Sequence, residues 1–306
     1  MKETVLITGG TGLVGQALTS LLLERGYQVT IFTRGKKRSD QRGLTYAQWD
    51  PARKTLDITA LQAADYIIHL AGANVADSRW TAKRKQEIVD SRVESANLLF
   101  DQLRQHPNKV KKVISASATG WYGEYTGKIF TENDPAADDF LGITCKAWEN
   151  SVRQMESLGK TVIILRTGIV LSLNGGAIRE FRKPARFGFA TVMGNGEQFV
   201  SWIHLQDLVR LYHNALLNDQ LHGVYNAVAP RPVTNLQLVQ SLARAMKGNS
   251  FITVHVPAFA LKLALGEMST EVLKSVKVSS EKIQQTGFVF SYPDVDSAVE
   301  QLVTHP

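Results

Sequence analysis

A glycine-rich segment near the start of the chain constrains the fold more than any other feature. Residues 4–7 are mostly apolar and β-branched, as in a buried strand, and Gly9, Gly12 and Gly15 follow at intervals of three. Apolar residues at helical spacing continue to Gly26. A strand, a glycine-rich turn and a helix in this order present backbone N–H groups and the positive end of a helix to a diphosphate. The segment therefore predicts an α/β sheet that binds a dinucleotide.

Each glycine of this turn has its own expected role. Gly9 turns the chain out of the strand, Gly12 lets the backbone approach the phosphates without a Cβ, and Gly15 lets the first helical turn pack against the sheet. The alternative is a turn without a ligand, but three glycines there would then lower helix stability with no compensating close approach. The residues of this turn expected at the cofactor are Gly9, Thr11, Gly12, Leu13, Val14 and Gly15.

A basic stretch follows the second expected strand, 28–32. An acidic residue at the end of that strand would accept hydrogen bonds from the ribose 2′-hydroxyl and select NAD. This chain instead has Thr33 and Arg34, followed by three basic residues at 36–38. Arg34 can form paired hydrogen bonds to a 2′-phosphate, and Thr33 can donate to it. We therefore expect NADP(H) as the cofactor; the alternative is a solvated basic loop.

The length and composition are those of a globular α/β protein. The chain has 306 residues, 44% hydrophobic and 21% charged, enough for one large domain with an appendage or two modest domains. Cys145 is the single cysteine, so no intrachain disulfide is expected, as in a reducing compartment. The chain starts in a strand, and its longest apolar run, 256–265, is interrupted by Pro257 and Lys262. We therefore expect a cytoplasmic protein with neither a signal peptide nor a membrane partner.

The formal net charge of +7 favours anionic ligands. The basic residues are dispersed in short groups and do not alternate with aromatic residues, as they do on surfaces that bind single-stranded nucleic acid. No nucleic-acid partner is expected. A phosphorylated cofactor and a small, anionic substrate account for the excess charge.

Strand-like and helix-like segments alternate, which predicts a doubly wound parallel sheet with helices on both faces, a Rossmann-type α/β fold. Further strands are expected over 44–49, within 63–72, and over 112–117, 161–166, 202–203 and 223–228. Helices are expected over 80–103, 140–158, 207–217, 235–246, 258–265 and 270–276. Residues 1–171 plus 201–229 form the expected nucleotide-binding domain. A loop at 172–200 plus residues 230–306 form a small lobe on the substrate side.

The chain resembles an extended short-chain dehydrogenase/reductase, the class that includes sugar-nucleotide epimerases and dehydratases. The resemblance covers essentially the whole chain. Beyond the glycine-rich turn, it rests on segments 69–72, 115–123 and 202–208. Segments 79–81, 90–92, 140–149, 165–171, 175–176 and 201–204 are similar to the "epimerase family" branch of atypical members, which carries a small C-terminal domain of unknown function.

The resemblance implies further cofactor-side residues. Arg92 stands where the parent class often has an asparagine, and Arg166 ends a central strand, where either an anion or a structural ion pair is expected. His204 is interpreted as a structural hydrogen-bonding residue before a helix cap at Asp207. The other residues assigned to the cofactor on this basis are Leu70, Ala71, Gly72, Ser115, Gly168 and Val170. The resemblance also implies a homodimer through the helices at 80–103 and 140–158.

The usual acid/base pair of the parent class is missing. That class places a tyrosine and a lysine four residues apart on one helix, where the lysine lowers the tyrosine pKa for proton transfer. Aligning this chain on Glu149 puts Leu141 and Cys145 at those two positions, and aligning it on Lys146 puts Gly142 at the tyrosine position. Neither alignment supplies a tyrosine.

Three residues are candidate substitutes. Ser117 stands at the position of the class's catalytic serine, with a serine bonded to the backbone as the alternative. Tyr122 can reach the nicotinamide region or can fill space beneath its loop. Cys145 is a soft acid beside Lys146, or a small core residue. Glu132 lies in the expected substrate loop or caps a turn. No cluster has metal-ligand spacing, so no metal is expected.

These observations predict an NADP(H)-dependent oxidoreductase or epimerase-like enzyme. Its substrate is expected to be small and polar or anionic, in the manner of a nucleotide sugar. The alternative is a non-catalytic NADP(H)-binding sensor or scaffold protein, a hypothesis that the missing tyrosine and lysine motivate.

Overall fold

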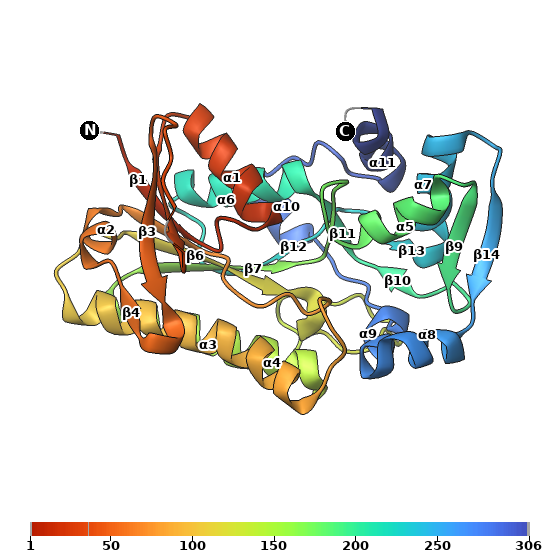
Figure 1. Ribbon diagram of the computed structural model, residues 1–306, viewed down its shortest axis with the longest axis horizontal. Helices are drawn as coiled ribbons and strands as arrows, with labels where there is room; N and C mark the ends of the chain where they lie inside the picture. The colour runs from red at the N-terminus through yellow and green to blue at the C-terminus, as the bar shows by residue number, and fades with distance from the viewer. Residues whose placement is uncertain (1, 36, 305–306) are drawn as a thin grey trace.

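The computed structural model describes residues 2–35 and 37–304. Its centre is one sheet with the strand order β12-β7-β6-β5-β1-β2-β3-β4, parallel except for β4 (Thr55–Leu56) at the edge (Figure 1). The chain builds outward from β1 in both directions, which confirms the doubly wound α/β class. The parallel strands are β1 (Thr4–Thr8), β2 (Gln28–Thr33), β3 (Leu44–Asp50), β5 (Tyr66–His69), β6 (Lys112–Ala118), β7 (Thr161–Thr167) and β12 (Gly223–Ala227).

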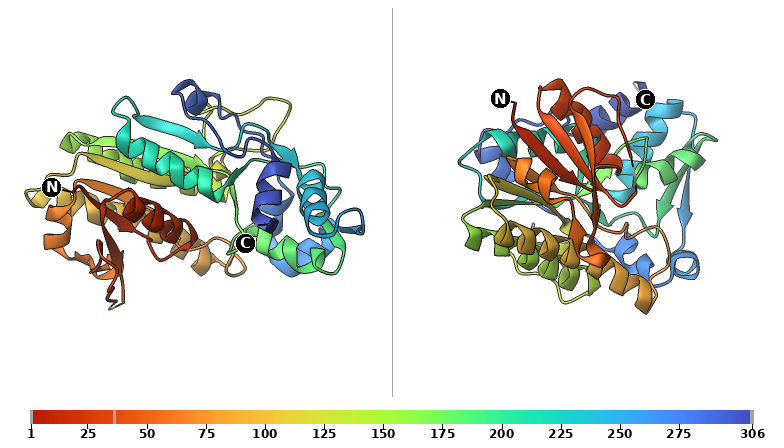
Figure 2. Two further views of the ribbon diagram at one scale, coloured as in Figure 1. Left: turned by 90° about the horizontal axis from the view of Figure 1, so that it is seen from above. Right: turned by 60° about the vertical axis from the view of Figure 1, so that its left-hand side comes forward.

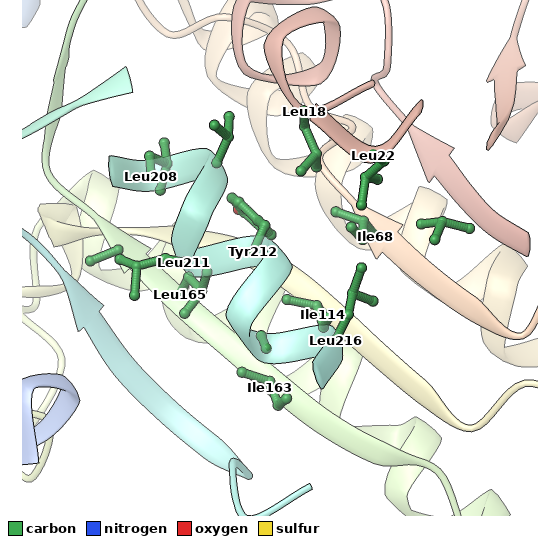
Figure 3. Packing of buried hydrophobic residues seen from close by; sticks show 14 of the residues in the cluster. Leu18, Leu22, Ile68, Ile114, Ile163, Leu165, Leu208, Leu211, Tyr212 and Leu216 are labelled. Carbon is green, nitrogen blue, oxygen red and sulfur yellow. The ribbon is translucent and has the colours of Figure 1, made fainter. Parts of the chain in front are cut away.

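Helices cover both faces of this sheet. α1 (Leu13–Glu24) and α6 (Leu205–Leu217) lie on one face, and α3 (Ala82–Gln105) and α4 (Phe140–Arg153) lie on the other (Figure 1). Side chains alternate along β1, so Val5 and Ile7 pack toward α1 and α6, whereas Leu6 packs toward α3 and α4. Figure 3 shows the first of these cores, where leucines of α1 and α6 meet isoleucines of three central strands. A short helix, α2 (Ile58–Ala63), precedes β5.

Most of the remaining elements gather at one end of the sheet (Figure 2). Several of them surround a third core, which includes Trp202, Leu242 and Val299. The strands are β8 (Ile169–Leu171) paired with β11 (Trp202–His204), β9 (Phe189–Met193) with β14 (Ile252–Val256), and β10 (Phe199–Val200) with β13 (Val233–Thr234). The helices are α5 (Ala177–Ala185), α7 (Asn235–Lys247), α8 (Ala258–Leu265), α9 (Ser269–Leu273), α10 (Glu281–Gln285) and α11 (Val295–Thr304).

Several boundaries differ from those predicted. The expected loop at 172–200 contains α5, β9 and β10 instead, because Pro184 falls in the last turn of α5 and does not break it. α6 begins with His204 as its N-cap, so Asp207 lies inside the first turn. The helix expected at 270–276 ends at Leu273, and the chain continues extended. α4 ends at Arg153 and continues as a 3₁₀ segment to Leu158, and neither β14 nor α11 was predicted.

The hydrophobic cores cross the expected division of the chain in more than one place. Ile283, Phe288 and Phe290 pack into the first core with α1 and α6, although they follow β14 in sequence. The division into a nucleotide-binding domain and a small lobe stays a prediction. Among residues 2–35 and 37–304, no helix is both long and apolar enough to cross a bilayer.

Candidate functional site

The glycine-rich turn joins β1 to α1 at the carboxyl edge of the sheet. Gly9 has a φ of +70°, and a Cβ there would lie 2.8 Å from the carbonyl carbon of Leu70. A Cβ on Gly15 would lie 2.5 Å from the Cα of Gly10, so Gly15 permits close packing against the turn itself and not, as expected, against the sheet. A Cβ on Gly12 would meet only the Gly9 carbonyl oxygen, at 3.4 Å.

Gly12 is the N-cap of α1, and no side chain caps that helix. The first backbone N–H groups of a helix have no partner within the helix. Gly12 and its neighbour Thr11 are exposed, and the space beside Gly12 is open. Uncapped N–H groups, a positive helix end and open space suit a diphosphate. Leu13 and Val14 begin the helix and are half-buried. The turn therefore fits the dinucleotide that the sequence predicts.

A second turn after β5 packs against the first. The Thr8 hydroxyl accepts hydrogen bonds from the backbone N–H groups of Leu70 and Ala71, both at 3.2 Å. Its own proton is therefore directed to His69 Nδ1, 2.8 Å away, and His69 carries its proton on Nε2, 3.3 Å from the Ser95 hydroxyl. Burial lowers the pKa of His69 to about 4, so the imidazole is neutral at pH 7.

Arg92 lies beneath this second turn. Its guanidinium donates to the carbonyls of Ala73 and Ile88 and lies 5.0 Å from the centre of the Trp148 ring. Burial lowers the pKa of Arg92. A Cβ on Gly72 would lie 3.1 Å from the Arg92 guanidinium carbon, so the glycine lets the side chain pass beneath the backbone. Arg92 is thus held by protein carbonyls in this structure.

A surface hollow of about 460 Å³ lies beside the end of β2. Arg34 is exposed at this end of the strand. The hollow thus has a basic rim at the place where the sequence predicts a 2′-phosphate. Its lining residues are Thr33, Gly35, Lys37, Arg38, Tyr46, Ala47 and Gln48.

Three polar residues lie in register across the central strands. Ser117 of β6 and Asn226 of β12 are both paired with Arg166 of β7. Glu149 of α4 faces them, and its carboxylate accepts from Arg166 Nε at 2.8 Å, Arg166 Nη2 at 3.0 Å and the Ser117 hydroxyl at 2.8 Å. Arg166 and Glu149 are each only 2% exposed. Arg166 therefore forms the structural ion pair, one of the two alternatives left open by the sequence.

Tyr122 extends this cluster. It is fully buried, receives a hydrogen bond from Arg166 Nη1 at 3.1 Å and donates to Asn226 Oδ1 at 2.6 Å. Burial raises the pKa of Tyr122 to about 12. The Trp121 ring stacks on the Arg166 guanidinium at 3.6 Å. We call Ser117, Glu149, Arg166, Tyr122 and Asn226 the buried polar network.

Cys145 lies apart from this network, on the buried side of α4. Its thiol is 3.8 Å from the Ala118 carbonyl, and burial raises its pKa to about 12. Lys146 is exposed. This geometry favours the alternatives of a packed thiol for Cys145 and a space-filling tyrosine for Tyr122. Their assignment as catalytic groups stays a hypothesis.

The other expected cofactor-side residues lie at the carboxyl edge of β6 and β7. Ser115 is buried in β6, and its hydroxyl donates to the Ala116 carbonyl. A Cβ on Gly168 would lie 2.5 Å from the Ser201 carbonyl oxygen, so this glycine lets β7 pass close to the chain before β11. Val170 lies in β8, paired with Ile203 of β11.

Sequence reasoning did not assign Glu149 or Asn226 to the site. Glu149 served only as an alignment position, and Asn226 only as part of a strand. A glutamate on the buried side of a predicted helix was the available signal for Glu149, because a buried carboxylate requires a partner. No local signal marked Asn226, since its place depends on the register of β12 against β7. The described residues contain no group of three or more potential metal ligands.

A Rossmann-type sheet with an uncapped glycine-rich turn defines a dinucleotide-binding protein. The family model for the NAD-dependent epimerase/dehydratase family matches residues 5–227, and a domain of unknown function, DUF1731, matches residues 256–302. The chain belongs to the NAD-dependent epimerase/dehydratase family, with this second domain at its C-terminal end. This confirms the resemblance drawn from the sequence.

Known relatives match this chain over nearly its whole length. An epimerase family protein of Staphylococcus saprophyticus is 36% identical over 299 residues, covering 97% of this chain and 98% of the relative. The human epimerase family protein SDR39U1, crystallised with NADPH, matches with a TM-score of 0.85 and 28% identity over 99% of this chain and 100% of that one. A nucleoside-diphosphate sugar epimerase from Corynebacterium glutamicum matches with a TM-score of 0.79 and 30% identity, over 99% of this chain and 59% of that one.

Proposed function

We propose that this protein is an NADP(H)-dependent oxidoreductase or epimerase-like enzyme acting on a small polar or anionic substrate. The observation that carries the proposal is the uncapped turn at Gly12, beside a hollow with a basic rim at the end of β2. The family match and the NADPH in a human relative support it. A relative titled a sugar epimerase supports a nucleotide-sugar-like substrate.

The geometry and the family resemblance support a set of proposed cofactor residues. The turn from Gly9 to Gly15 holds the diphosphate through backbone N–H groups, and Arg34 and Thr33 hold the 2′-phosphate. The backbone at Leu70 and Ala71 bounds the adenosine side. When bound, a nicotinamide accepts or donates a hydride. The remaining expected residues would support the dinucleotide-binding surface from beneath. They are Gly72, Arg92, Ser115, Arg166, Gly168 and Val170.

Ser117 is the proposed contact between the protein and a reacting oxygen. Its hydroxyl donates to Glu149, which leaves the oxygen lone pairs to accept a hydrogen bond from a substrate hydroxyl. Glu149 in turn is held by two bonds from Arg166. The Ser117 oxygen is thus a hydrogen-bond acceptor in a fixed position, and the buried ion pair of Glu149 and Arg166 holds it there. The group that takes the tyrosine's place in proton transfer stays unassigned.

Calorimetry with NADPH and NADH tests the cofactor assignment. We expect tighter binding of NADPH, and we expect Arg34→Ala to weaken NADPH binding by about 10- to 100-fold while leaving NADH binding unchanged, as for loss of one charged hydrogen-bonding partner. Arg42→Ala, also exposed, is the matched control and should bind both nucleotides as the unmodified protein does. Equal affinities for the two nucleotides would contradict the NADP(H) assignment, and no heat with either would remove the dinucleotide site.

A second function has one observation in its favour. Neither alignment supplies the tyrosine of the parent class, whose position holds Leu141 in one and Gly142 in the other, and the nearby polar groups already have protein partners. A sensor or scaffold that binds NADP(H) without turnover would show this pattern. NADPH oxidation measured by absorbance, across carbonyl compounds and sugar nucleotides, separates the two functions. Binding without oxidation of any compound would favour the sensor.

The homodimer through α3 and α4 also remains a proposal, testable by light scattering.

A further inference from the structure

One segment of the C-terminal domain runs between the loop that carries Tyr122 and strand β10 of the lobe. Residues 274–279, here called the strap, follow α9 in extended form and precede α10. On one side the strap bonds to the loop that carries Tyr122. Tyr125 N donates to Ser275 O at 2.7 Å and Phe130 N to Lys277 O at 2.9 Å, while Ser279 N donates to Phe130 O at 2.8 Å. The loop is thus held as if by an added strand.

The other side of the strap bonds to β10 and the residue that follows it. Val276 N donates to Phe199 O at 3.0 Å, and Phe199 N donates to the Ser275 hydroxyl at 2.9 Å. The Ser201 hydroxyl donates to Val276 O and accepts from Val278 N, both at 2.9 Å. With partners on both sides, the strap has little freedom to shift without breaking several backbone hydrogen bonds.

Each end of the strap reaches another element of the buried polar network. At its start, Lys274 forms an ion pair with Asp139, the N-cap of α4, and α4 carries Glu149. At its end, Ser279 O accepts from Asn226 Nδ2 at 3.1 Å, while Asn226 Oδ1 accepts from Tyr122. The Lys274 side chain is only 8% exposed and that of Asp139 is 37% exposed, so the ion pair is partly shielded from solvent. Figure 1 shows α9, just before the strap, beside the lower helices of the sheet.

We propose that the C-terminal domain of unknown function positions the buried polar network through the strap. The loop supplies Tyr122, α4 supplies Glu149 and β12 supplies Asn226, and the strap bonds to all three elements. Arg166 donates to Glu149 and Tyr122, and Tyr122 donates to Asn226, so a shift of any one element breaks a bond of the network. The inference rests on the proposed function only in taking the carboxyl ends of β6 and β7 as the place of reaction.

The physical reason lies in loop entropy. The segment from residue 122 to residue 134 lacks a helix or strand of its own, apart from an isolated bridge between Phe130 and Val278 of the strap. Ordering such a loop costs conformational entropy for every residue. The strap offsets that cost with backbone hydrogen bonds, and the Tyr122 and Phe130 rings then stack at 5.2 Å. Lys274, Ser275 and Ser279 are therefore positioning residues, since they act through the network.

Hydrogen exchange measured by mass spectrometry tests the proposal. In Lys274→Ala we expect amide exchange in peptides covering 119–135 and the first turn of α4 to rise by about tenfold or more, with β1 and β5 unchanged. Lys274→Arg should restore protection because it restores the ion pair. Lys262→Ala, an exposed lysine of α8, is the matched control and should exchange like the unmodified protein. Unchanged exchange at 119–135, or an equal rise in every peptide, would overturn the proposal.

A second variant and a fluorescence measurement keep the proposal testable if Lys274→Ala fails to fold. Asn226→Asp keeps an acceptor for Tyr122 but loses the donor to Ser279, so it cuts the connection at the end of the strap and adds a carboxyl group at a buried position. The difference in fluorescence between each protein and its Trp121→Phe version isolates the tryptophan stacked on Arg166. We expect that difference spectrum to shift to longer wavelength in Lys274→Ala and in Asn226→Asp; an unshifted spectrum in both would overturn the proposal. Neither readout uses a nucleotide, so failure to bind NADPH would remove the proposed function and leave this result to stand.

Discussion

Gly12 and Gly15 both lack a Cβ, but the surroundings of the two residues differ. Gly15 is buried against the backbone of its own turn, where a methyl group has no room. Gly12 is exposed, has ordinary extended backbone angles and faces open space. Gly15 is therefore required by the fold, whereas nothing in the fold itself requires Gly12, as the proposed diphosphate site predicts.

Alanine substitutions separate these two roles. Gly15→Ala should lower the free energy of unfolding by about 1–3 kcal/mol, because its Cβ would overlap Gly10. Gly12→Ala should change it by less than about 0.5 kcal/mol. The same variant should weaken NADPH binding by about tenfold or more, because the methyl group fills the space for a phosphate. Urea unfolding and calorimetry measure the two effects, with Gly123→Ala as control. Normal NADPH binding by Gly12→Ala would place the diphosphate elsewhere.

Residue-level reasoning from the sequence succeeded where a local pattern sets the geometry. The glycine spacing predicted a turn that the structure contains, since the requirement for a missing Cβ arises within a few residues. The partners of Arg166 could not be predicted in the same way. Glu149 comes from a different element, and Asn226 meets Arg166 only through the pairing of β12 with β7. Such contacts depend on tertiary register, which a single sequence does not encode locally.

At the scale of elements, β5 ends in a histidine that ties two turns together. His69 accepts from Thr8 on one ring nitrogen and faces Ser95 with the other. Protonation would place a second N–H against the Thr8 hydroxyl, which already accepts two backbone bonds. The neutral ring is therefore part of how the strand end is built.

This arrangement predicts a pH dependence of stability. Burial lowers the pKa of His69 from its ordinary 6.5 to about 4, so the unfolded chain binds more protons between these values. The contribution of neutral His69 to the free energy of unfolding is therefore fully present above pH 6.5. It is lost as the pH falls toward 4, which lowers the free energy of unfolding by up to about 3 kcal/mol. His69→Asn should flatten this part of the profile, and His222→Asn, an exposed site, should retain it. Urea unfolding between pH 4 and 7.5 measures the slope; equal slopes in all three proteins would refute a buried neutral histidine.

Elements of the parallel sheet were predictable because buried strands are continuous apolar runs. All seven parallel strands were anticipated, with ends shifted by a few residues at most. The lobe was less predictable. β14 is mostly exposed or half-buried, with little apolar continuity, and α5 sits between glycines and contains a proline. Those signals normally mark loops. In α5 packing in the third core overrides them, whereas β14 is held by its pairing with β9.

At the scale of the whole molecule, the C-terminal domain contributes to the core of the nucleotide-binding sheet. Phe288 and Phe290 pack edge to face at 5.0 Å, and both belong to the core that contains α1 and α6. Arg210 of α6 lies 5.3 Å from the Phe288 ring centre. The two parts of the chain are therefore joined by apolar packing as well as by the strap.

Two neighbouring residues test this connection. Phe288→Ala should lower the free energy of unfolding by roughly 3–5 kcal/mol, because it leaves a cavity in a closed core. Val289→Ala, whose side chain is 72% exposed, should change it by less than about 0.5 kcal/mol. Urea unfolding followed by circular dichroism gives both values. A small effect of Phe288→Ala would mean that the sheet and the C-terminal domain unfold as separate units.

The return of residues 281–290 to the first core has a consequence for biosynthesis. A ribosome that has finished β12 has already synthesised every strand of the central sheet, yet the nascent chain still lacks Ile283, Phe288 and Phe290. Domains generally fold in the order in which they are translated. Here the part of the chain that is made first reaches its final stability only after residues 283–290 have been translated, so termination before them would yield a protein with an open apolar face.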